Sequence, residues 1–339
     1  MSDIEALVCT HWGHWSELTV QRLARPALGP GQVRIRVHHA GVGFAVSLFV
    51  SGKYQRKPPL PFTPGTEVSG VILETAPDVQ HLHPGQRVVA ALDWGAYAEE
   101  AIASAHTTYP VPEGLDLSQA AALPITYGTV WAALEWRAKL QPGETLLVHG
   151  ASGALGTAAV QIGRLMGATV IATASTEAKR AAALENGAHH VLSSQADELA
   201  KSVKALCPKG GADIIFDPVG GDLFDASLRC IAPEGRLLTI GYASGRIPNA
   251  AANLLLVKNV SLIGFNYGYY IGWGLTDERA TYADRVQEIV GKILTAVAEG
   301  KLPPPRTHHF PFHQWEEAIN TVMERRSVGK VILDIGSRA

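Results

Sequence analysis

The sequence has few cysteines, almost no net charge and no long apolar segment. Its 339 residues include three cysteines, which lie far apart and form no Cys-x-x-Cys pair. This spacing excludes a disulfide framework and a four-cysteine zinc lobe. We expect Cys207 and Cys230, which lie in helix-like patterns, to be small core residues.

The charge balance and the lack of long apolar runs exclude further classes of protein. A formal net charge of −2 gives no general attraction to nucleic acid or to an anionic membrane surface. No apolar run reaches the roughly 18 residues that a transmembrane helix needs. The first residues, Met-Ser-Asp-Ile-Glu, lack the pattern of a signal peptide. We therefore expect a cytoplasmic protein that binds neither nucleic acid nor membranes.

Two regions with different patterns follow one another along the chain, and its length also favours two domains. Residues 1–122 contain short strand-like segments interrupted by glycine and proline, such as 32–37, where apolar and polar residues alternate. From about residue 123, strand-like and helix-like segments alternate. The predicted strands of this second region are 145–149, 168–174, 189–193, 212–217, 235–241 and 259–264.

This alternation predicts an α/β fold. Helices between successive strands of one sheet require a parallel sheet, and the six strands predict a doubly wound sheet of the Rossmann type. The first region is predicted to be a mostly β unit, a partly closed barrel. After the sheet we expect a helix near 276–299, a helix at 314–325 and a strand at 329–335.

The most informative segment joins a predicted strand to a predicted helix through a glycine-rich turn. The strand is 145–149, and the turn contains Gly150, Gly153 and Gly156. A helix that begins in such a turn directs free backbone N–H groups and its positive end toward an anion. The next strand, 168–174, completes a βαβ unit, in which this anion is the pyrophosphate of a dinucleotide. Because the pattern is not the standard Gly-x-Gly-x-x-Gly, the alternative is a glycine-rich turn that binds no nucleotide.

The end of the second strand predicts which dinucleotide binds. NAD sites usually carry an acidic residue here, which hydrogen-bonds the ribose 2′-hydroxyl. This chain has Ala174, Ser175 and Thr176 instead, followed by Lys179 and Arg180. Hydroxyl and cationic groups accept a 2′-phosphate, so we predict a preference for NADPH over NADH. The alternative is that the two cations lie on a solvated helix face.

Segments along nearly the whole chain match one known enzyme family. They are 52–54, 58–65, 84–88, 121–129, 141–144, the glycine turn, 216–221 and 329–331. Together they resemble the zinc-independent medium-chain dehydrogenase/reductases, in the quinone oxidoreductase and enoyl reductase branch. The resemblance implies a GroES-like catalytic domain formed by residues 1–122 and 266–339 and a Rossmann NADP-binding domain at 123–265. It also implies a homodimer or homotetramer.

The resemblance implies which residues contact NADPH. Thr129 should contact the nicotinamide carboxamide, and Ser175 and Lys179 should hold the 2′-phosphate. Ser194 stands where many relatives add a tyrosine to the phosphate site. The pyrophosphate should be lined by Ser152, Gly153, Ala154 and Leu155. The remaining implied contacts are Gly43, Gly241, Tyr242, Ala243, Phe265, Asn266 and Lys330.

The chain lacks the zinc ligands of the zinc-dependent relatives. Those relatives have cysteine at the position of Gly43 and histidine at the position of Thr66, which leaves only Glu67. One carboxylate cannot hold Zn²⁺. Several histidines occur in close pairs, but we expect no three-ligand set because adjacent residues of a strand point to opposite faces. We therefore predict no metal site. The pairs are His11 and His14, His38 and His39, His81 and His83, His189 and His190, and His308 and His309.

The implied reaction is a hydride transfer from NADPH without a metal ion. The acceptor would be a quinone or the C=C bond of an α,β-unsaturated carbonyl compound, and the developing enolate needs a proton donor. Tyr54 matches the tyrosine that serves as this donor in the enoyl reductase relatives. The alternative is that Tyr54 only forms a wall of the substrate pocket.

The substrate region departs from the family pattern. Relatives usually have asparagine where this chain has Gly43 and aspartate where it has Val46. With Phe44 and Leu48 nearby, we expect an apolar wall and a bulky, apolar acceptor. Aromatic residues of a later loop either add to this wall or pack a dimer interface; they are Tyr242, Tyr267, Tyr269, Tyr270 and Trp273.

Two other functions remain as alternatives. One is an NADPH-binding protein with a structural or regulatory role and little catalysis, which the loss of the asparagine at Gly43 favours. The other is a zinc-type alcohol dehydrogenase, which the missing ligands disfavour.

Overall fold

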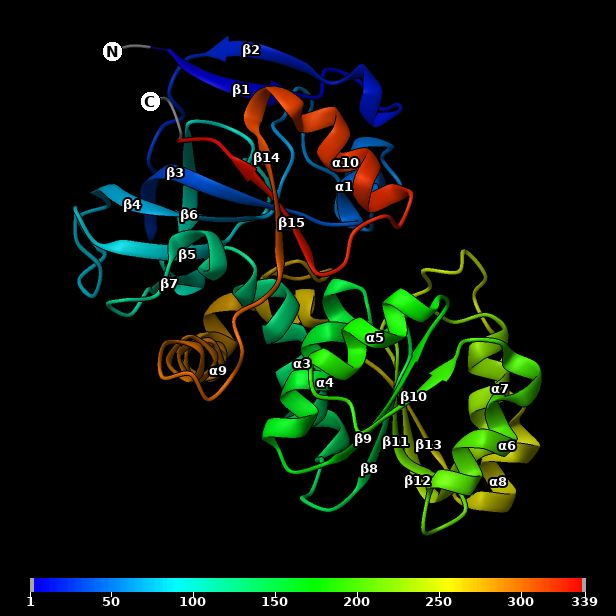
Figure 1. Ribbon diagram of the computed structural model, residues 1–339. Helices are drawn as coiled ribbons and strands as arrows, with labels where there is room; N and C mark the ends of the chain where they lie inside the picture. Colours follow the sequence, from blue (N-terminus) through cyan, green and yellow to red (C-terminus); the bar gives the residue numbers. More distant parts are fainter. Residues whose placement is uncertain (1–2, 337–339) are drawn as a thin grey trace. The chain divides into compact units, whose positions relative to one another are not determined.

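The computed structural model describes residues 3–336, and the chain forms two compact units (Figure 1). One comprises Met1–Gly128, Gly268–Gly300 and Pro304–Ala339 and is here named the β-rich unit. The other comprises Thr129–Tyr267 and Lys301–Pro303 and is named the parallel-sheet unit. No helix among the described residues combines the length and apolarity of a membrane span.

The parallel-sheet unit contains a six-stranded sheet in the order β10-β9-β8-β11-β12-β13, and every pairing in it is parallel. This is the doubly wound order, with the switch point between β8 and β11. The predicted Rossmann-type sheet is therefore confirmed. The strands are β8 (Thr145–Val148), β9 (Thr169–Ala174), β10 (His190–Ser193), β11 (Ala212–Asp217), β12 (Ile231–Thr239) and β13 (Ser261–Gly264).

Helices connect these strands and bury apolar side chains against the sheet. Leu147, Ile171, Ile215 and Leu237 each come from a different strand, and all are fully buried in one cluster. Cys207 and Cys230 also lie in this cluster, as expected from the sequence. The helices are α4 (Ala154–Leu165), α5 (Glu177–Glu185), α6 (Ala196–Leu206), α7 (Asp222–Cys230) and α8 (Ala252–Lys258), preceded by α3 (Gly128–Ala132) and the π-helical turn η4 (Ala133–Ala138).

The β-rich unit contains a seven-stranded sheet that is built from both ends of the chain. Its order is β14-β15-β3-β4-β5-β7, and β6 also pairs with β3. Near the C-terminus, β15 lies antiparallel to β3, with Asp334 opposite His39 (Figure 1). The strands are β3 (Gln32–Val42), β4 (Glu67–Thr75), β5 (Arg87–Ala91), β6 (Glu100–Ser104), β7 (Thr108–Pro110), β14 (Thr307–Pro311) and β15 (Lys330–Asp334).

Shorter elements and a two-stranded sheet complete the β-rich unit. β1 (Ile4–Val8) pairs with β2 (Thr19–Leu23). The helices are α1 (Ala45–Val50), α2 (Leu117–Ala120), α9 (Arg279–Ala298) and α10 (Trp315–Met323). Single turns are η1 (Trp15–Glu17), η2 (Ala105–Thr107), η3 (Leu123–Tyr127), η5 (Tyr267–Ile271) and η6 (Phe312–Gln314).

Two strands differ most from their predicted bounds: β12 (Ile231–Thr239) begins four residues before the predicted 235–241, and β3 extends beyond its predicted end. The sequence predicts a strand at 32–37, whereas β3 continues to Val42. The register between β3 and β4 shifts between Val37 and His39, so a bulge interrupts the regular alternation of side chains at His38. The strand extends this far because its last residues pair with β15. The paired residues His39 and Asp334 are 295 positions apart in the sequence.

Candidate functional site

Most of the predicted cofactor residues follow the carboxyl ends of the parallel strands. The glycine turn follows β8, Ser175 follows β9 and Ser194 follows β10. Gly241 lies shortly after β12, and Phe265 follows β13. The carboxyl ends of parallel strands share one edge of a sheet, where doubly wound proteins bind their ligands at the switch point.

The glycine turn packs too tightly for side chains at one of its positions. A Cβ added at Gly156 would lie 2.2 Å from the carbonyl oxygen of Gly150, which is backbone and cannot move aside cheaply. Gly150 has a φ of +61°, a conformation that favours glycine. Gly153 has an ordinary φ of −77° and space for a Cβ at 3.5 Å from the same oxygen. The close approach therefore depends on Gly156.

The N-terminus of α4 is an anion-binding end. Gly153 is the N-cap residue, and no side chain caps the helix. The backbone N–H groups of the first turn, at Ala154 and Leu155, therefore remain available, and the helix dipole adds positive potential. A hydrogen bond of 3.0 Å from Ala151 N to Thr173 O joins the turn to β9. This end is suited to the pyrophosphate that the sequence predicts.

The ends of β9 and β10 bring two predicted phosphate residues close together. Ser194 N donates to Ala174 O at 3.2 Å, and Ser175 is exposed immediately after Ala174. Arg180, on the first turns of α5, reaches back and donates to Ala174 O at 3.4 Å. Lys179 is half-buried on the same helix. No carboxylate follows β9 directly, and the nearest acidic residue is Glu177 in the first turn of α5.

A loop after β12 is fixed to the loop after β11. Ile240 N donates to Asp217 O, Ala243 N to Pro218 O and Ser244 N to Val219 O, at 2.9, 3.1 and 2.9 Å. These bonds hold Gly241, Tyr242 and Ala243 in one conformation. Phe265 is buried, Thr129 is buried on α3, and Asn266 is exposed.

The sequence analysis does not identify Asp217, which stabilises the loop after β11. Its Oδ1 accepts hydrogen bonds from Val219 N at 2.8 Å and Gly220 N at 2.9 Å. The side chain is fully buried. The signal in the sequence is the Asp-Pro-Val-Gly-Gly run at the end of a predicted strand, because aspartate often caps such a turn.

Sequence reasoning also missed His149, which directly precedes the glycine turn. The ring is fully buried, and its Nδ1 and Nε2 lie 3.0 Å from Thr173 Oγ1 and 2.7 Å from Ser227 Oγ. Ser227 Oγ donates to Leu223 O, so it accepts from Nε2, and Nδ1 accepts from Thr173. Burial lowers the pKa of His149, while the charge of Asp217 acts in the opposite direction. The neutral ring thus links β8, β9 and α7.

In the β-rich unit, a buried ion pair lies beside Gly43. Lys330 Nζ contacts Glu67 Oε1, and both side chains are buried. A Cβ at Gly43 would lie 3.7 Å from Lys330 Nζ, so Gly43 leaves open space next to the ammonium group. The carboxylate of Glu67, the remaining position of the zinc pattern, is therefore paired with a cation.

Tyr54 is half-buried at the turn after α1. Its ring stacks on Phe49 with centroids 4.2 Å apart, and its backbone N–H donates to Leu48 O at 3.1 Å. Burial raises the pKa of the Tyr54 phenol, and a hydrogen bond with Gln55 partly opposes this. The phenol therefore stays protonated and can donate a hydrogen bond.

The residues of the expected apolar wall lie in different environments. Val46 is buried in the core of the β-rich unit, because α1 packs this side chain against the sheet. Phe44 is 53% exposed. Among the aromatic residues of the later loop, Tyr267 and Trp273 are buried, and Tyr242 is exposed. Tyr269 and Tyr270 pack against Tyr282 instead of forming a continuous surface.

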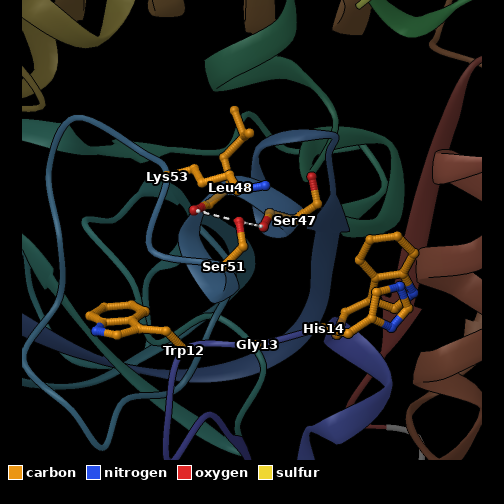
Figure 2. Close-up of a pocket in the computed structure, with 8 residues that line it drawn as sticks. Trp12, Gly13, His14, Ser47, Leu48, Ser51 and Lys53 are labelled. Atoms are coloured by element: carbon orange, nitrogen blue, oxygen red, sulfur yellow. Dashed lines mark hydrogen bonds between the residues drawn. The ribbon is translucent and has the colours of Figure 1, made fainter.

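A cavity of about 440 Å³ opens in the β-rich unit (Figure 2). Figure 2 shows that the segment of Trp12 and His14 lies on one side of it and α1 on the other. Ser51 Oγ donates to Ser47 O at 2.7 Å at its border. Of the residues expected near the acceptor, Leu48 of the apolar wall lines it. The lining residues are Trp12, Gly13, His14, Trp15, Ser47, Leu48, Ser51 and Lys53.

The expectation that the histidines form no three-ligand set is wrong. His39 and His309, from two different sequence pairs, lie with Asp334 in a group whose ligand atoms are all within 4.8 Å of one another. Alternation within each pair did not reveal this group, because its members come from three strands of the folded sheet.

Comparison with known proteins agrees with this architecture. Residues 29–113 match a family model described as the alcohol dehydrogenase GroES-like domain, and residues 154–288 match one described as zinc-binding dehydrogenase. Quinone oxidoreductase-like protein 2 of Rattus norvegicus is 38% identical over 331 residues, which cover 97% of this chain and 92% of that protein. The synaptic vesicle membrane protein VAT-1 homolog of Homo sapiens is 32% identical over 350 residues, covering 97% and 86%.

A solved structure supports the same relationship. A mycobacterial protein in complex with NADPH superimposes with a TM-score of 0.88 at 28% identity, covering 98% of this chain and all of the other. The fold is thus a two-domain α/β fold with a GroES-like domain. The chain belongs to the quinone oxidoreductase branch of the medium-chain dehydrogenase/reductase family.

Proposed function

We propose that this oxidoreductase uses NADPH to reduce a quinone or the C=C bond of an α,β-unsaturated carbonyl compound. The observation that carries the proposal is the uncapped N-terminus of α4 beside the switch point of the sheet, with Ser175 and Ser194 at the neighbouring strand ends. The relatives named as quinone oxidoreductases and the NADPH-bound neighbour support it.

We assign the cofactor to the parallel-sheet unit and the acceptor to the β-rich unit. The first turn of α4, with Ser152 and Gly153, would hold the pyrophosphate. Ser175, Lys179 and Ser194 would hold the 2′-phosphate. The other assigned contacts are Thr129, Gly241, Tyr242, Ala243, Phe265 and Asn266, together with Gly43 and Lys330 from the β-rich unit.

The chain's own residues would supply position and a proton. NADPH, when bound, supplies the hydride. The Tyr54 phenol would donate a proton to the oxygen on which negative charge develops, while the raised pKa that burial gives the phenol opposes this transfer. A role as a wall of the acceptor pocket remains the alternative for Tyr54.

We propose that the reaction needs no metal ion. The positions of Gly43 and Thr66 offer no ligand, and the Glu67 carboxylate is already paired with the Lys330 ammonium. A cation placed there would be repelled by this buried ammonium group. The space at Gly43 and the exposed ring of Phe44 favour a bulky, apolar acceptor.

A second candidate is an NADPH-binding protein with little catalysis. Gly43, in place of the usual asparagine, removes a polar group from the expected nicotinamide region. Fluorescence titration with NADPH and NADH, followed by assays with a quinone and with a bulky aromatic enone, separates the two candidates. Tight NADPH binding with turnover supports the reductase, and the better acceptor identifies the branch. Tight binding without turnover favours the second candidate.

We further propose a homodimer that forms through the outer edge of the parallel sheet. β13 ends the sheet, and beyond it no other strand pairs with it in residues 3–336. On the neighbouring α8, Leu256 and Val257 are 77% and 72% exposed. An exposed strand edge beside exposed apolar side chains is typical of an interface.

A further inference from the structure

The face of the sheet formed by β3, β15 and β14 carries a cluster of two histidines and one aspartate. His39 and Asp334 are direct partners in the antiparallel pair of β3 and β15. His309 on β14 is the partner of Ile332, which lies two residues from Asp334 on β15. Residues two apart on a strand share a face, and so do direct partners. The backbone register therefore places all three side chains on one face.

The three side chains converge on one carboxylate oxygen. The Nδ1 atoms of His39 and His309 lie 2.7 and 2.9 Å from Oδ1 of Asp334. The two rings are nearly perpendicular, with an interplanar angle of 88° and centroids 6.0 Å apart. The side chains of His39 and Asp334 are 23% and 21% exposed, and that of His309 is 36% exposed. An ion in solution can therefore reach a group that the sheet holds in place.

We propose that His39, His309 and Asp334 form a binding site for Zn²⁺ that is separate from the reductase site. Two imidazole nitrogens and one carboxylate oxygen are a ligand set that zinc uses, with water in the fourth position. Ligand atoms about 2.0–2.1 Å from a tetrahedral zinc ion are about 3.3 Å from one another. The two nitrogen–oxygen separations of 2.7 and 2.9 Å therefore need to widen by about half an ångström, and the ligand nitrogens of the two histidines lie within 4.8 Å of each other.

The proton balance of binding is simple. Each neutral histidine moves its proton from Nδ1 to Nε2, so that the Nδ1 lone pair binds the ion, and the aspartate remains ionised. His309 has an acceptor for the relocated proton, because its Nε2 lies 3.0 Å from Thr307 Oγ1. Such an outer hydrogen bond fixes the tautomer and orientation of a zinc-bound histidine.

The site would tie together strands from both ends of the chain. His39 and Asp334 are 295 positions apart in sequence. An ion that binds only the folded arrangement stabilises it. The site lies at the end of β15 opposite Lys330, four residues and about 13 Å along the strand. It is also distinct from the zinc position of the family, which corresponds to Gly43, Thr66 and Glu67.

The test is a competition titration of chelator-treated protein with Zn²⁺ against a chromophoric chelator. We expect the wild type to bind one Zn²⁺ per chain. In His309→Gln the Zn²⁺ affinity should be more than about 100-fold weaker, because loss of even a residue that only hydrogen-bonds a metal ligand lowers metal affinity about 10–100-fold. The matched control is His308→Gln, whose ring instead contacts Val328 O and whose side chain lies on the other face of β14. This variant should bind like the wild type.

A second measurement gives a readout that does not depend on the competitor. Zn²⁺ should raise the unfolding temperature of the wild type and of His308→Gln, but not that of His309→Gln or Asp334→Asn. Equal Zn²⁺ affinity in the wild type and in His309→Gln, or no stoichiometric binding by the wild type, would overturn the proposal. If the metal-free unfolding temperatures of His309→Gln and Asp334→Asn match that of the wild type, these two variants fold without the ion.

Discussion

At Gly156 the missing side chain is a packing requirement. A Cβ added at Gly156 would lie 2.2 Å from the backbone oxygen of Gly150, and Gly156 itself lies in the first turn of α4. We predict that Gly156→Ala shifts the turn and abolishes measurable NADPH binding. Gly291→Ala on α9, at an exposed position with no atom within 4 Å of the added Cβ, is the control and should bind NADPH normally. Fluorescence titration checks both, and equal affinities would show that the turn does not hold the cofactor.

His149 makes a second prediction at this scale, for stability against pH. Burial lowers its pKa below the ordinary 6.5, so the folded protein keeps the ring neutral while the unfolded chain binds a proton. Stability is therefore lost as pH falls below about 6.5, by up to about 1.4 kcal/mol per pH unit for one proton.

The measurement is the free energy of unfolding in denaturant between pH 8 and pH 5. Burial also lowers the pKa values of His38 and His189, so only the difference between proteins is informative. His149→Gln should lose less stability on acidification than the wild type. Parallel curves for His149→Gln and the wild type would contradict the assignment of a buried neutral ring.

Among the elements, the ends of β9 and β10 should determine the choice between NADPH and NADH. We predict that Lys179→Ala weakens NADPH binding about 10–100-fold and leaves NADH binding nearly unchanged, because a charge-assisted hydrogen bond contributes about 1.5–3 kcal/mol. Ser175→Asp should reduce the preference further by adding a charge that repels the 2′-phosphate. Lys201→Ala on α6, at an exposed lysine, is the control. An equal loss of NADPH and NADH affinity in Lys179→Ala would refute its role in the choice of cofactor.

The helices and strands differ in how well the sequence patterns predict them. The apolar strands of the parallel sheet and the glycine turn depend on local spacing, so the sequence predicts them almost in full. The position of the strands' carboxyl ends at one edge of the sheet then follows from the parallel topology. In contrast, the position of Val46 in the core depends on how α1 packs, and the meeting of His39 with His309 depends on a register between distant strands. The bulge beside His38 also has no local signal in the sequence.

For the whole molecule, we predict a dimer that depends on α8 and β13. Light scattering coupled to gel filtration should give about twice the chain mass of 36.1 kDa for the wild type. The double variant Leu256→Glu and Val257→Glu should elute as a monomer. Leu275→Glu changes a leucine that is 97% exposed in the β-rich unit and should remain dimeric. A wild-type monomer, or a double variant that still dimerises, would refute this interface.

The proposed reaction is a hydride transfer from NADPH without a metal ion at the cofactor site. The most direct test is steady-state NADPH oxidation by a quinone or an aromatic enone, after exhaustive treatment with a chelator. We predict turnover by the wild type and Gly291→Ala, a lower rate with NADH, and none by Gly156→Ala. Turnover that disappears with the chelator and returns only with added metal would contradict it, and so would undiminished turnover by Gly156→Ala.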